Sequence, residues 1–412
     1  MKKSALFLLP VVVSFFTGWF LIDYLTVHPL KMSFYLAISL ILFVLLILLI
    51  LRIKPAKKKG LNILVSVIML VSGYLINASI FLNQEDSRFV PELTREPDSS
   101  EKGHNAIVYF THGEPETYNP IGWINQFKEL DEHEIQFVSF ISWPFFIYPL
   151  RKKYLEVGTS NHRRTHKEML HSLEKLYRNG GDSTTKFYLC FLDDEPRPDA
   201  AVIRAINDGA DTVIVATVFL TISNHTAEGQ NMIHELDIES KYDVELVFTE
   251  PMWSSELLMK SFLEKVEEHI GNTPREEVAI ALIGHGQPDE WDEEWPTETS
   301  QEIKFREDVI NMFAAEGFRP ENMGLAWMEF KYPKPIELME SFVKNGVKKV
   351  FYFSAAISAD AIHSQVDIPR LVMEYKFPQD VEVINLGAWN NHPFVIKAFK
   401  EKIDNRKIAL VE

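Results

Sequence analysis

Residues 278–286 read VAIALIGHG and residues 106–113 read AIVYFTHG, so two apolar runs end in the same His-Gly pair. Three more runs, DTVIVATVFLT (211–221), KKVFYFSAAIS (348–358) and VEVINLG (381–387), are rich in β-branched and aromatic residues and are bounded by turn residues. Nearly continuous apolar runs of this length are typical of strands that are buried on both faces of a parallel sheet. The sequence therefore predicts an α/β fold.

Amphipathic helical patterns separate these runs, and this alternation indicates parallel sheets covered by helices on both faces. A helix, a glycine and a strand also follow one another twice. When Gly209 is aligned with Gly346, His225 and His363 fall only one position out of step. We therefore expect a duplicated fold with a cleft between its halves. The predicted halves are residues 105–272 and residues 273–412.

Histidines follow strands in both halves. His285 follows the run VAIALIG, and His363 lies just after KKVFYFSAAIS, with Asp367 four residues further on. Ligands bind beyond the carboxyl ends of strands in open α/β sheets, so we expect the two imidazoles to meet in one crevice. Two imidazoles with a carboxylate nearby suit a divalent metal ion. A single histidine after a strand is more often structural. Histidines also follow strands in the first half, at His112 and His225, and this recurrence favours a functional site.

Three apolar stretches open the chain, at residues 5–27, 33–53 and 61–82. Each is close to the ~20 residues that a helix needs to cross a bilayer. The opening MKK is also typical of a signal peptide, but no small-residue cleavage site precedes the later stretches. We therefore predict an uncleaved membrane anchor over residues 1–84 and a linker over residues 85–104.

The basic residues predict the orientation of this anchor. MKK (1–3) and RIKPAKKKG (52–60) fall on the same side of three spans, and basic loops stay in the cytoplasm. The acidic segment after Leu82 then begins on the far side. We predict an integral membrane protein whose soluble domain is extracytoplasmic.

Charge and cysteine content exclude several kinds of protein. The first 84 residues carry eight basic residues and one acidic residue, which gives them a charge of +7. Because the net charge of the whole chain is −16, the remaining residues carry a net charge of −23. A part so acidic argues against nucleic-acid binding, which requires a basic face. Cys190 is the only cysteine, so neither a disulfide framework nor a cysteine-held metal cluster is expected.

These motifs resemble those of the ferrochelatase and sirohydrochlorin-type cobalt chelatase superfamily, over nearly all of residues 105–405. VYFTHGEPETY (108–118) is similar to the opening strand and loop of ferrochelatases, and IGHGQP (283–288) falls where their second half begins. SADAIHSQVDI (358–368) falls where ferrochelatases have a Ser-Asp-His-x-Glu pattern. The resemblance implies a class II chelatase-like α/β fold with two similar Rossmann-like halves and parallel sheets, here preceded by three transmembrane helices.

The resemblance also implies roles for single residues. His285 matches the metal-site histidine that helps to remove pyrrole protons, and His363 replaces the ferrochelatase glutamate, as a histidine does in the small cobalt chelatases. Both are expected to hold the metal and to take part in catalysis. Asp367 matches an acidic position in the line of polar groups that leads away from the metal. The residues expected to bind the substrate are His112, Tyr118, Arg151, Lys152, Lys153 and Trp327, of which the basic run would face tetrapyrrole carboxylates.

The implied activity is that of a membrane-anchored, ferrochelatase-like lyase. It would insert Fe²⁺, Co²⁺ or a similar metal into a porphyrin or sirohydrochlorin-type macrocycle, as in haem synthesis, with Asp367 or Glu329 relaying protons and Tyr118, Trp123 and Trp327 packing on the ring. No permanently bound cofactor is expected, because the metal is a substrate; the expected partners are the tetrapyrrole and membrane lipid. The alternative is a non-catalytic extracytoplasmic protein that binds a tetrapyrrole or a metal on the same fold.

Overall fold

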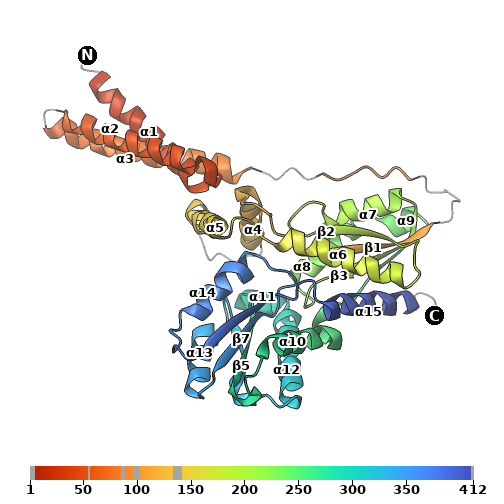
Figure 1. The fold of residues 1–412 in the computed structure, drawn as a ribbon. Helices are drawn as coiled ribbons and strands as arrows, with labels where there is room; N and C mark the ends of the chain where they lie inside the picture. The colour runs from red at the N-terminus through yellow and green to blue at the C-terminus, as the bar shows by residue number, and fades with distance from the viewer. Residues whose placement is uncertain (1–4, 54–55, 85–88, 96–102, 133–141, 410–412) are drawn as a thin grey trace. The chain divides into compact units, whose positions relative to one another are not determined.

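The structure of the chain is a computed structural model, and it describes residues 5–53, 56–84, 89–95, 103–132 and 142–409 (Figure 1). The chain divides into two compact units. The unit that contains the predicted anchor, called the anchor unit, comprises Met1–Ser87 and Thr117–Thr159. The other, called the sheet unit, comprises Arg88–Glu116 and Ser160–Glu412. The chain therefore passes from one unit to the other three times.

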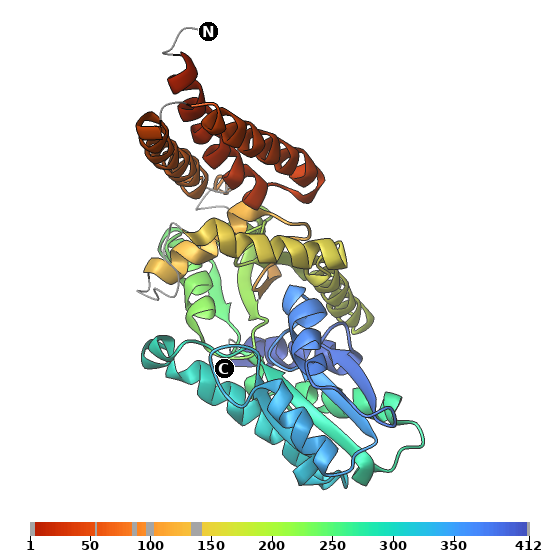
Figure 2. The same ribbon diagram turned by 90° about the vertical axis from the view of Figure 1, so that its left-hand side faces the viewer.

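Three long helices run through the anchor unit: α1 (Ala5–Thr26), α2 (Met32–Leu51) and α3 (Ala56–Leu82). Figure 2 shows them side by side. Each contains a stretch long and apolar enough to cross a membrane, at Leu8–Thr26, Pro29–Leu51 and Lys58–Leu82. The prediction of three helices of membrane-spanning length is confirmed.

Helices α1 and α3 pack closely and run parallel. A Cβ atom on Gly73 would lie 2.0 Å from the backbone oxygen of Phe15, so the two backbones touch, as small residues allow at crossings of membrane helices. Further along both helices, Asn77 donates a hydrogen bond to Asp23 (3.0 Å). The contacts advance in the same direction on both helices, so their carboxyl ends lie at the same end of the unit. This direction is the one that a three-span topology requires.

The anchor unit also contains α4 (Pro120–Glu132) and α5 (Trp143–Val157). Arg151 Nη1 donates to the backbone oxygens of Tyr24 (2.5 Å) and Val27 (3.1 Å), and the Tyr118 hydroxyl donates to that of Thr26 (3.0 Å). The last carbonyls of a helix have no partner within it, and a cation stabilises that end. The segment that holds α4 and α5, which the sequence placed in the first half, thus completes the carboxyl end of α1.

The sheet unit contains two parallel sheets of four strands. Their strand orders are β2-β1-β3-β4 and β6-β5-β7-β8. Both halves therefore have the same topology, which confirms the predicted duplicated α/β fold. The strands are β1 (His104–Thr111), β2 (Lys186–Phe191), β3 (Ala210–Thr217), β4 (Glu245–Phe248), β5 (Val278–Gly284), β6 (Met323–Trp327), β7 (Lys349–Ser354) and β8 (Glu382–Gly387).

Helices connect the strands, because parallel neighbours need crossover connections. Those of the first half are α6 (His162–Asn179), α7 (Pro198–Asn207), α8 (Asn224–His234), α9 (Ile238–Lys241) and α10 (Glu256–Ile270). Those of the second half are α11 (Asp289–Glu294), α12 (Pro296–Ala315), α13 (Pro335–Lys344), α14 (Ile368–Met373) and α15 (Pro393–Ala409).

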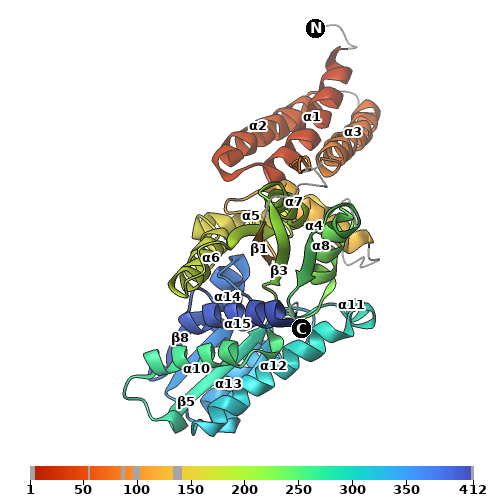
Figure 3. The ribbon, with the colours of Figure 1, turned by 90° about the vertical axis from the view of Figure 1, so that its right-hand side faces the viewer.

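One hydrophobic core joins the two halves. It contains Tyr109 of β1 and Leu282 of β5, together with Phe262 of α10 and Phe399 of α15. Figure 3 shows α10 and α15 next to each other. The alternate residues of the same strands face two smaller cores, one in each half. Each sheet is therefore buried on both faces, as the apolar runs predicted.

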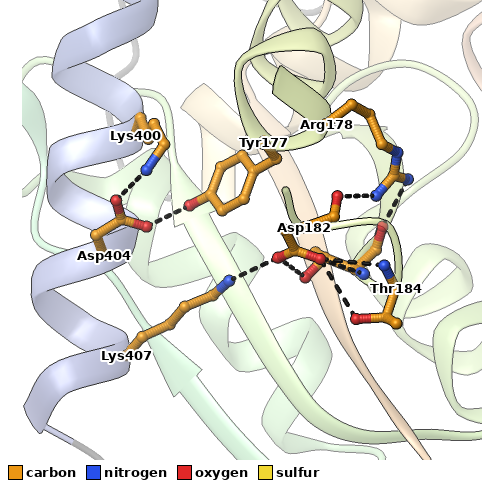
Figure 4. A network of polar contacts seen from close by, with 8 residues as sticks. Tyr177, Arg178, Asp182, Thr184, Lys400, Asp404 and Lys407 are labelled. Carbon is orange, nitrogen blue, oxygen red and sulfur yellow. Dashed lines mark hydrogen bonds and ion pairs between the residues drawn. The ribbon is translucent and has the colours of Figure 1, made fainter. Parts of the chain in front are cut away.

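Polar contacts also fix α15 to α6, so the last helix of the second half is held by the first (Figure 4). The Tyr177 hydroxyl donates to Asp404 (2.8 Å), and Lys407 Nζ lies 3.8 Å from an oxygen of Asp182. Burial alone would raise the pKa of Asp182, but hydrogen bonds from Thr185 and Thr184 and the charge of Lys407 together outweigh it and lower the pKa to about 2. Asp182 thus stays charged opposite Lys407 at neutral pH.

Candidate functional site

His285 directly follows β5, at the carboxyl edge of the second sheet. The next residue, Gly286, has a φ of +84°, and a Cβ atom there would lie 2.5 Å from the backbone oxygen of Glu329. Only glycine fits this turn. The turn brings the Gly286 carbonyl oxygen to 2.7 Å from His285 Nδ1. Because a carbonyl oxygen only accepts, Nδ1 carries the proton and Nε2 the lone pair.

His363 begins a single turn of π-helix, η6 (His363–Asp367), which follows β7. Its Nδ1 lies 2.8 Å from Asp367 Oδ2. The carboxylate accepts the Nδ1 proton, so the lone pair of this ring also lies on Nε2. The two side chains lie one helical turn apart, in agreement with their spacing in the sequence. Turns of π-helix are rare and are frequently found at functional sites.

The two imidazoles lie together. The ring centres of His285 and His363 are 5.3 Å apart, with the ring planes at 77°. A metal–nitrogen bond of about 2.1 Å would place each ring centre roughly 3 Å from a shared ion, so this separation allows both rings to bind one ion. Among the residues that the structure describes, no group of three or more His, Cys, Asp or Glu side chains is arranged to hold a metal. The pair thus offers two protein ligands.

His285 is kept neutral by its surroundings. Burial lowers its pKa, a positive charge on His363 when that ring is protonated would lower it further, and the carboxylate of Glu329 acts in the opposite direction. The net effect is a lowered pKa, so the ring is uncharged at neutral pH and can bind a metal. Glu329 lies beside it because its backbone N–H donates to the backbone oxygen of His285 (3.0 Å).

Glu114, from the first half, reaches the same place. Its buried carboxylate accepts the backbone N–H of Ile362 on both oxygens (3.0 and 3.1 Å). Burial raises the pKa of Glu114, and a hydrogen bond from Ser160 and the charge of His363 only partly oppose this. Ile362 immediately precedes His363, so a residue of the first half fixes the position of a candidate ligand in the second. The sequence did not predict this contact.

The first half repeats the arrangement around His112. Its Nδ1 lies 3.2 Å from Asp193 Oδ2, and its ring centre lies 4.7 Å from that of His225. Asp193 is equivalent to Glu329: its backbone N–H donates to the backbone oxygen of His112 (2.8 Å), just as that of Glu329 donates to His285. Sequence reasoning missed Asp193, although it follows β2 as Glu329 follows β6.

The other predicted substrate residues have different surroundings. Tyr118 and Arg151 lie in the anchor unit, where both donate to carbonyls at the end of α1. Lys152 is exposed and Lys153 is partly exposed on α5. Trp327 is buried at the end of β6, with the guanidinium carbon of Arg306 3.9 Å from its ring centre. Tyr118, Arg151 and Trp327 thus have packing contacts within the chain, and their role in binding a substrate stays a prediction.

A further pair of buried imidazoles lies on α6. The ring centres of His162 and His166 are 4.4 Å apart. His166 Nδ1 lies 3.0 Å from the Tyr109 hydroxyl, and its Nε2 lies 3.2 Å from the Thr111 hydroxyl. Burial, with a smaller effect from the charge of His112, lowers the pKa of His166 to about 3. His166 is therefore neutral at neutral pH, with hydroxyl groups in contact with both of its ring nitrogens.

The acid sensitivity of the sheet unit is expected to depend on His166. In the unfolded chain its pKa is near 6.5, whereas in the folded chain it is about 3. Below pH 6.5 the unfolded state therefore binds more protons, and the free energy of unfolding decreases as the pH falls toward 3. His166→Gln keeps a neutral hydrogen-bonding group. Its thermal unfolding midpoint, measured by circular dichroism, is expected to fall less steeply over this pH range, and an unchanged slope would contradict the assignment.

No family model matches the sequence, and no curated protein matches it significantly. Solved structures are similar to it in fold. SirB from Bacillus subtilis with Fe³⁺ is 15% identical, with a TM-score of 0.46, over 73% of this chain and 95% of that one. The sirohydrochlorin chelatase SirB from Bacillus subtilis subspecies spizizenii in complex with cobalt is 12% identical, with a TM-score of 0.45, over 73% and 94%. DR2241 from Deinococcus radiodurans, a multi-domain protein with structural similarity to chelatases, is 11% identical, with a TM-score of 0.47, over 73% and 55%.

Proposed function

We propose that this chain is a membrane-anchored metal chelatase that inserts a divalent metal, Fe²⁺ or Co²⁺, into a porphyrin or sirohydrochlorin-type tetrapyrrole. The observation that carries the proposal is the meeting of His285 and His363, whose ring centres are 5.3 Å apart. His285 donates its Nδ1 proton to the backbone oxygen of Gly286, and His363 donates its Nδ1 proton to Asp367. The lone pairs of both rings therefore lie on Nε2. The resemblance of the flanking motifs to those of chelatases supports the same conclusion.

A site with two imidazoles suits a metal that must be released. Structural metal sites are closed by four protein ligands, whereas sites that exchange ligands keep positions open. Neutral imidazole binds iron, cobalt, nickel and zinc, and burial keeps His285 neutral. The remaining positions on the ion would be taken by water and then by the pyrrole nitrogens. His285 and His363 would thus hold the ion until the macrocycle replaces them.

Insertion also requires that two pyrrole N–H protons leave for each M²⁺ that enters. The imidazole of His363 can accept a proton at Nε2 while its Nδ1 proton moves toward Asp367, 2.8 Å away. Asp367 is then the first step of a proton path away from the ring. Glu329, beside His285, would serve the second proton. His112 stays a proposed substrate-facing residue, because it follows β1 as His285 follows β5 and its ring centre lies 4.7 Å from that of His225.

We also propose that α1, α2 and α3 hold the protein in the membrane, with the sheet unit on the extracytoplasmic side. The parallel packing of α1 and α3 and the basic residues at the start of α3 support this topology. A reporter that is active only in the cytoplasm, fused after residue 412, is expected to be inactive. Strong activity of that fusion would contradict the proposed side.

The test of the proposed reaction is a spectral assay. The detergent-purified full chain is incubated with a porphyrin or with sirohydrochlorin and with Co²⁺ or Fe²⁺, and the visible spectrum is followed. Many molecules of metallated product per protein molecule are expected, at a rate well above that without protein. A shift that stops at one equivalent would contradict catalysis and favour the alternative, a non-catalytic binder.

A further inference from the structure

Helix α5 carries large apolar side chains on its exposed surface. Phe145, Phe146 and Leu155 are 50%, 44% and 49% exposed. The opposite face of the helix is buried in the anchor unit, where Trp143, Ile147 and Tyr154 are among its buried residues. Exposed apolar groups gathered on one element mark an interaction surface.

The first turn of α5 lies alongside a membrane-spanning helix. The ring of Phe145 stacks on Tyr74 of α3, with ring centres 5.9 Å apart and planes at 22°. Tyr74 lies eight residues before Leu82, the end of that span, which corresponds to about 12 Å along the helix. Leu75 and Ile76, the next residues of α3, are also exposed. Phe145 therefore lies at the depth of apolar side chains that a bilayer would surround.

The second half of α5 lies at the end of a span. Arg151 donates to the backbone oxygen of Tyr24, two residues before α1 ends, and the hydroxyls of Tyr24 and Tyr148 are 3.4 Å apart. Lys152 Nζ lies 4.7 Å from the ring centre of Tyr148. Tyrosine rings and lysine side chains are typical of the boundary between hydrocarbon and headgroups. Along α5 the surroundings thus change from apolar to basic.

We infer that α5 is a membrane-interface helix. Its first turn, with Phe145 and Phe146, is immersed in lipid hydrocarbon, and Lys152 and Lys153 meet the phosphates of the headgroups. The occupant of this surface is the bilayer itself, because the surface is continuous with the apolar faces of the spans in the same compact unit. An interfacial helix of this kind binds through its buried apolar area and through attraction to anionic lipid.

The segment that contains α4 and α5 leaves the sheet unit after Glu116 and returns to it at Ser160. The backbone N–H of Ser160 donates to the backbone oxygen of Glu116 (2.9 Å), which closes the base of the segment that contains α4 and α5. The hydroxyl of Ser160 also hydrogen-bonds to Glu114, which holds the backbone before His363. The chain therefore leaves and re-enters the sheet unit at two residues that contact each other, one of which also contacts Glu114 of the candidate site.

The test is the depth of single nitroxide labels in vesicles of phosphatidylcholine and phosphatidylglycerol. Cys190→Ala removes the only native cysteine, and Phe145→Cys introduces the labelled position. Two positions in the same chain serve as references. Leu48→Cys, 52% exposed on α2, reports hydrocarbon, and Ile408→Cys, 57% exposed on α15, reports water.

The ratio of collisions with oxygen to collisions with a water-soluble nickel chelate is measured by electron paramagnetic resonance. The ratio at position 145 is expected to approach that at 48 and to exceed that at 408 several-fold. Equal ratios at 145 and 408 would overturn the inference. If the label at 48 also collides freely with the nickel chelate, the membrane anchor itself is refuted. Neither outcome involves metal insertion, so failure here is distinguishable from failure of the proposed reaction.

Discussion

Replacement of His363 with alanine is expected to slow metal insertion by at least about 100-fold, the usual loss when a group that transfers protons is removed. The variant loses one of the two imidazoles that meet at 5.3 Å and the ring that passes its Nδ1 proton to Asp367. The fold should survive, because the ring is partly exposed and lies outside the hydrophobic cores. The initial rate of spectral change in the insertion assay measures the effect.

Two variants control this result. His171→Ala removes an exposed histidine of α6 and is expected to leave the rate unchanged. Asp367→Asn keeps the shape of the side chain but removes its charge, so we expect a rate between those of the wild type and of His363→Ala. An unchanged rate in His363→Ala, with the circular dichroism spectrum of the wild type, would remove the proposed mechanism.

Replacement of Arg306 with methionine is expected to give the largest loss of stability. Arg306 is fully buried on α12, where Nη1 donates to the backbone oxygens of Leu282 (3.2 Å) and Ala326 (2.9 Å). Its Nη2 lies 3.4 Å from Glu302, which is also buried. Methionine leaves the glutamate without its cation and two strand-end carbonyls without their donor. Breaking a buried ion pair in this way costs about 3–5 kcal/mol of unfolding free energy.

For a unit of this size such a loss corresponds to a drop of roughly 10 °C in the unfolding midpoint. The matched control is the double variant Arg306→Met, Glu302→Gln, which removes both charges. It is expected to recover a large part of the loss, because the uncompensated buried charge is gone. Differential scanning calorimetry of the detergent-purified chain measures all three proteins. Equal midpoints for the single and double variants would show that the charge of Glu302 is not the cause.

The strands were predictable because each satisfies a local rule. Residues 278–284 and 349–354 are apolar, rich in β-branched or aromatic side chains and bounded by turns, and they form β5 and β7. The repetition of His-Gly after two strands predicted the duplication, since it reflects a turn that glycine alone can make, with a φ of +84° at Gly286. The spacing of His363 and Asp367 likewise predicted a local contact.

Contacts between distant segments could not be predicted in this way. An amphipathic helix shows that it buries one face, but its pattern does not show which apolar surface it covers. The sequence therefore placed α5 in the first half, whereas Arg151 completes the end of α1. The same holds for Glu114 and Ile362, which are 248 positions apart and whose contact depends on the packing of both halves.

The most direct measurement is the X-ray absorption of the Co²⁺-loaded chain at the cobalt edge, for the wild type and for His363→Ala. Sharing of one ion by His285 and His363 predicts two imidazole nitrogens at about 2.1 Å in the wild type and one in the variant. The same number of imidazole nitrogens in both proteins, or none in the wild type, would contradict it.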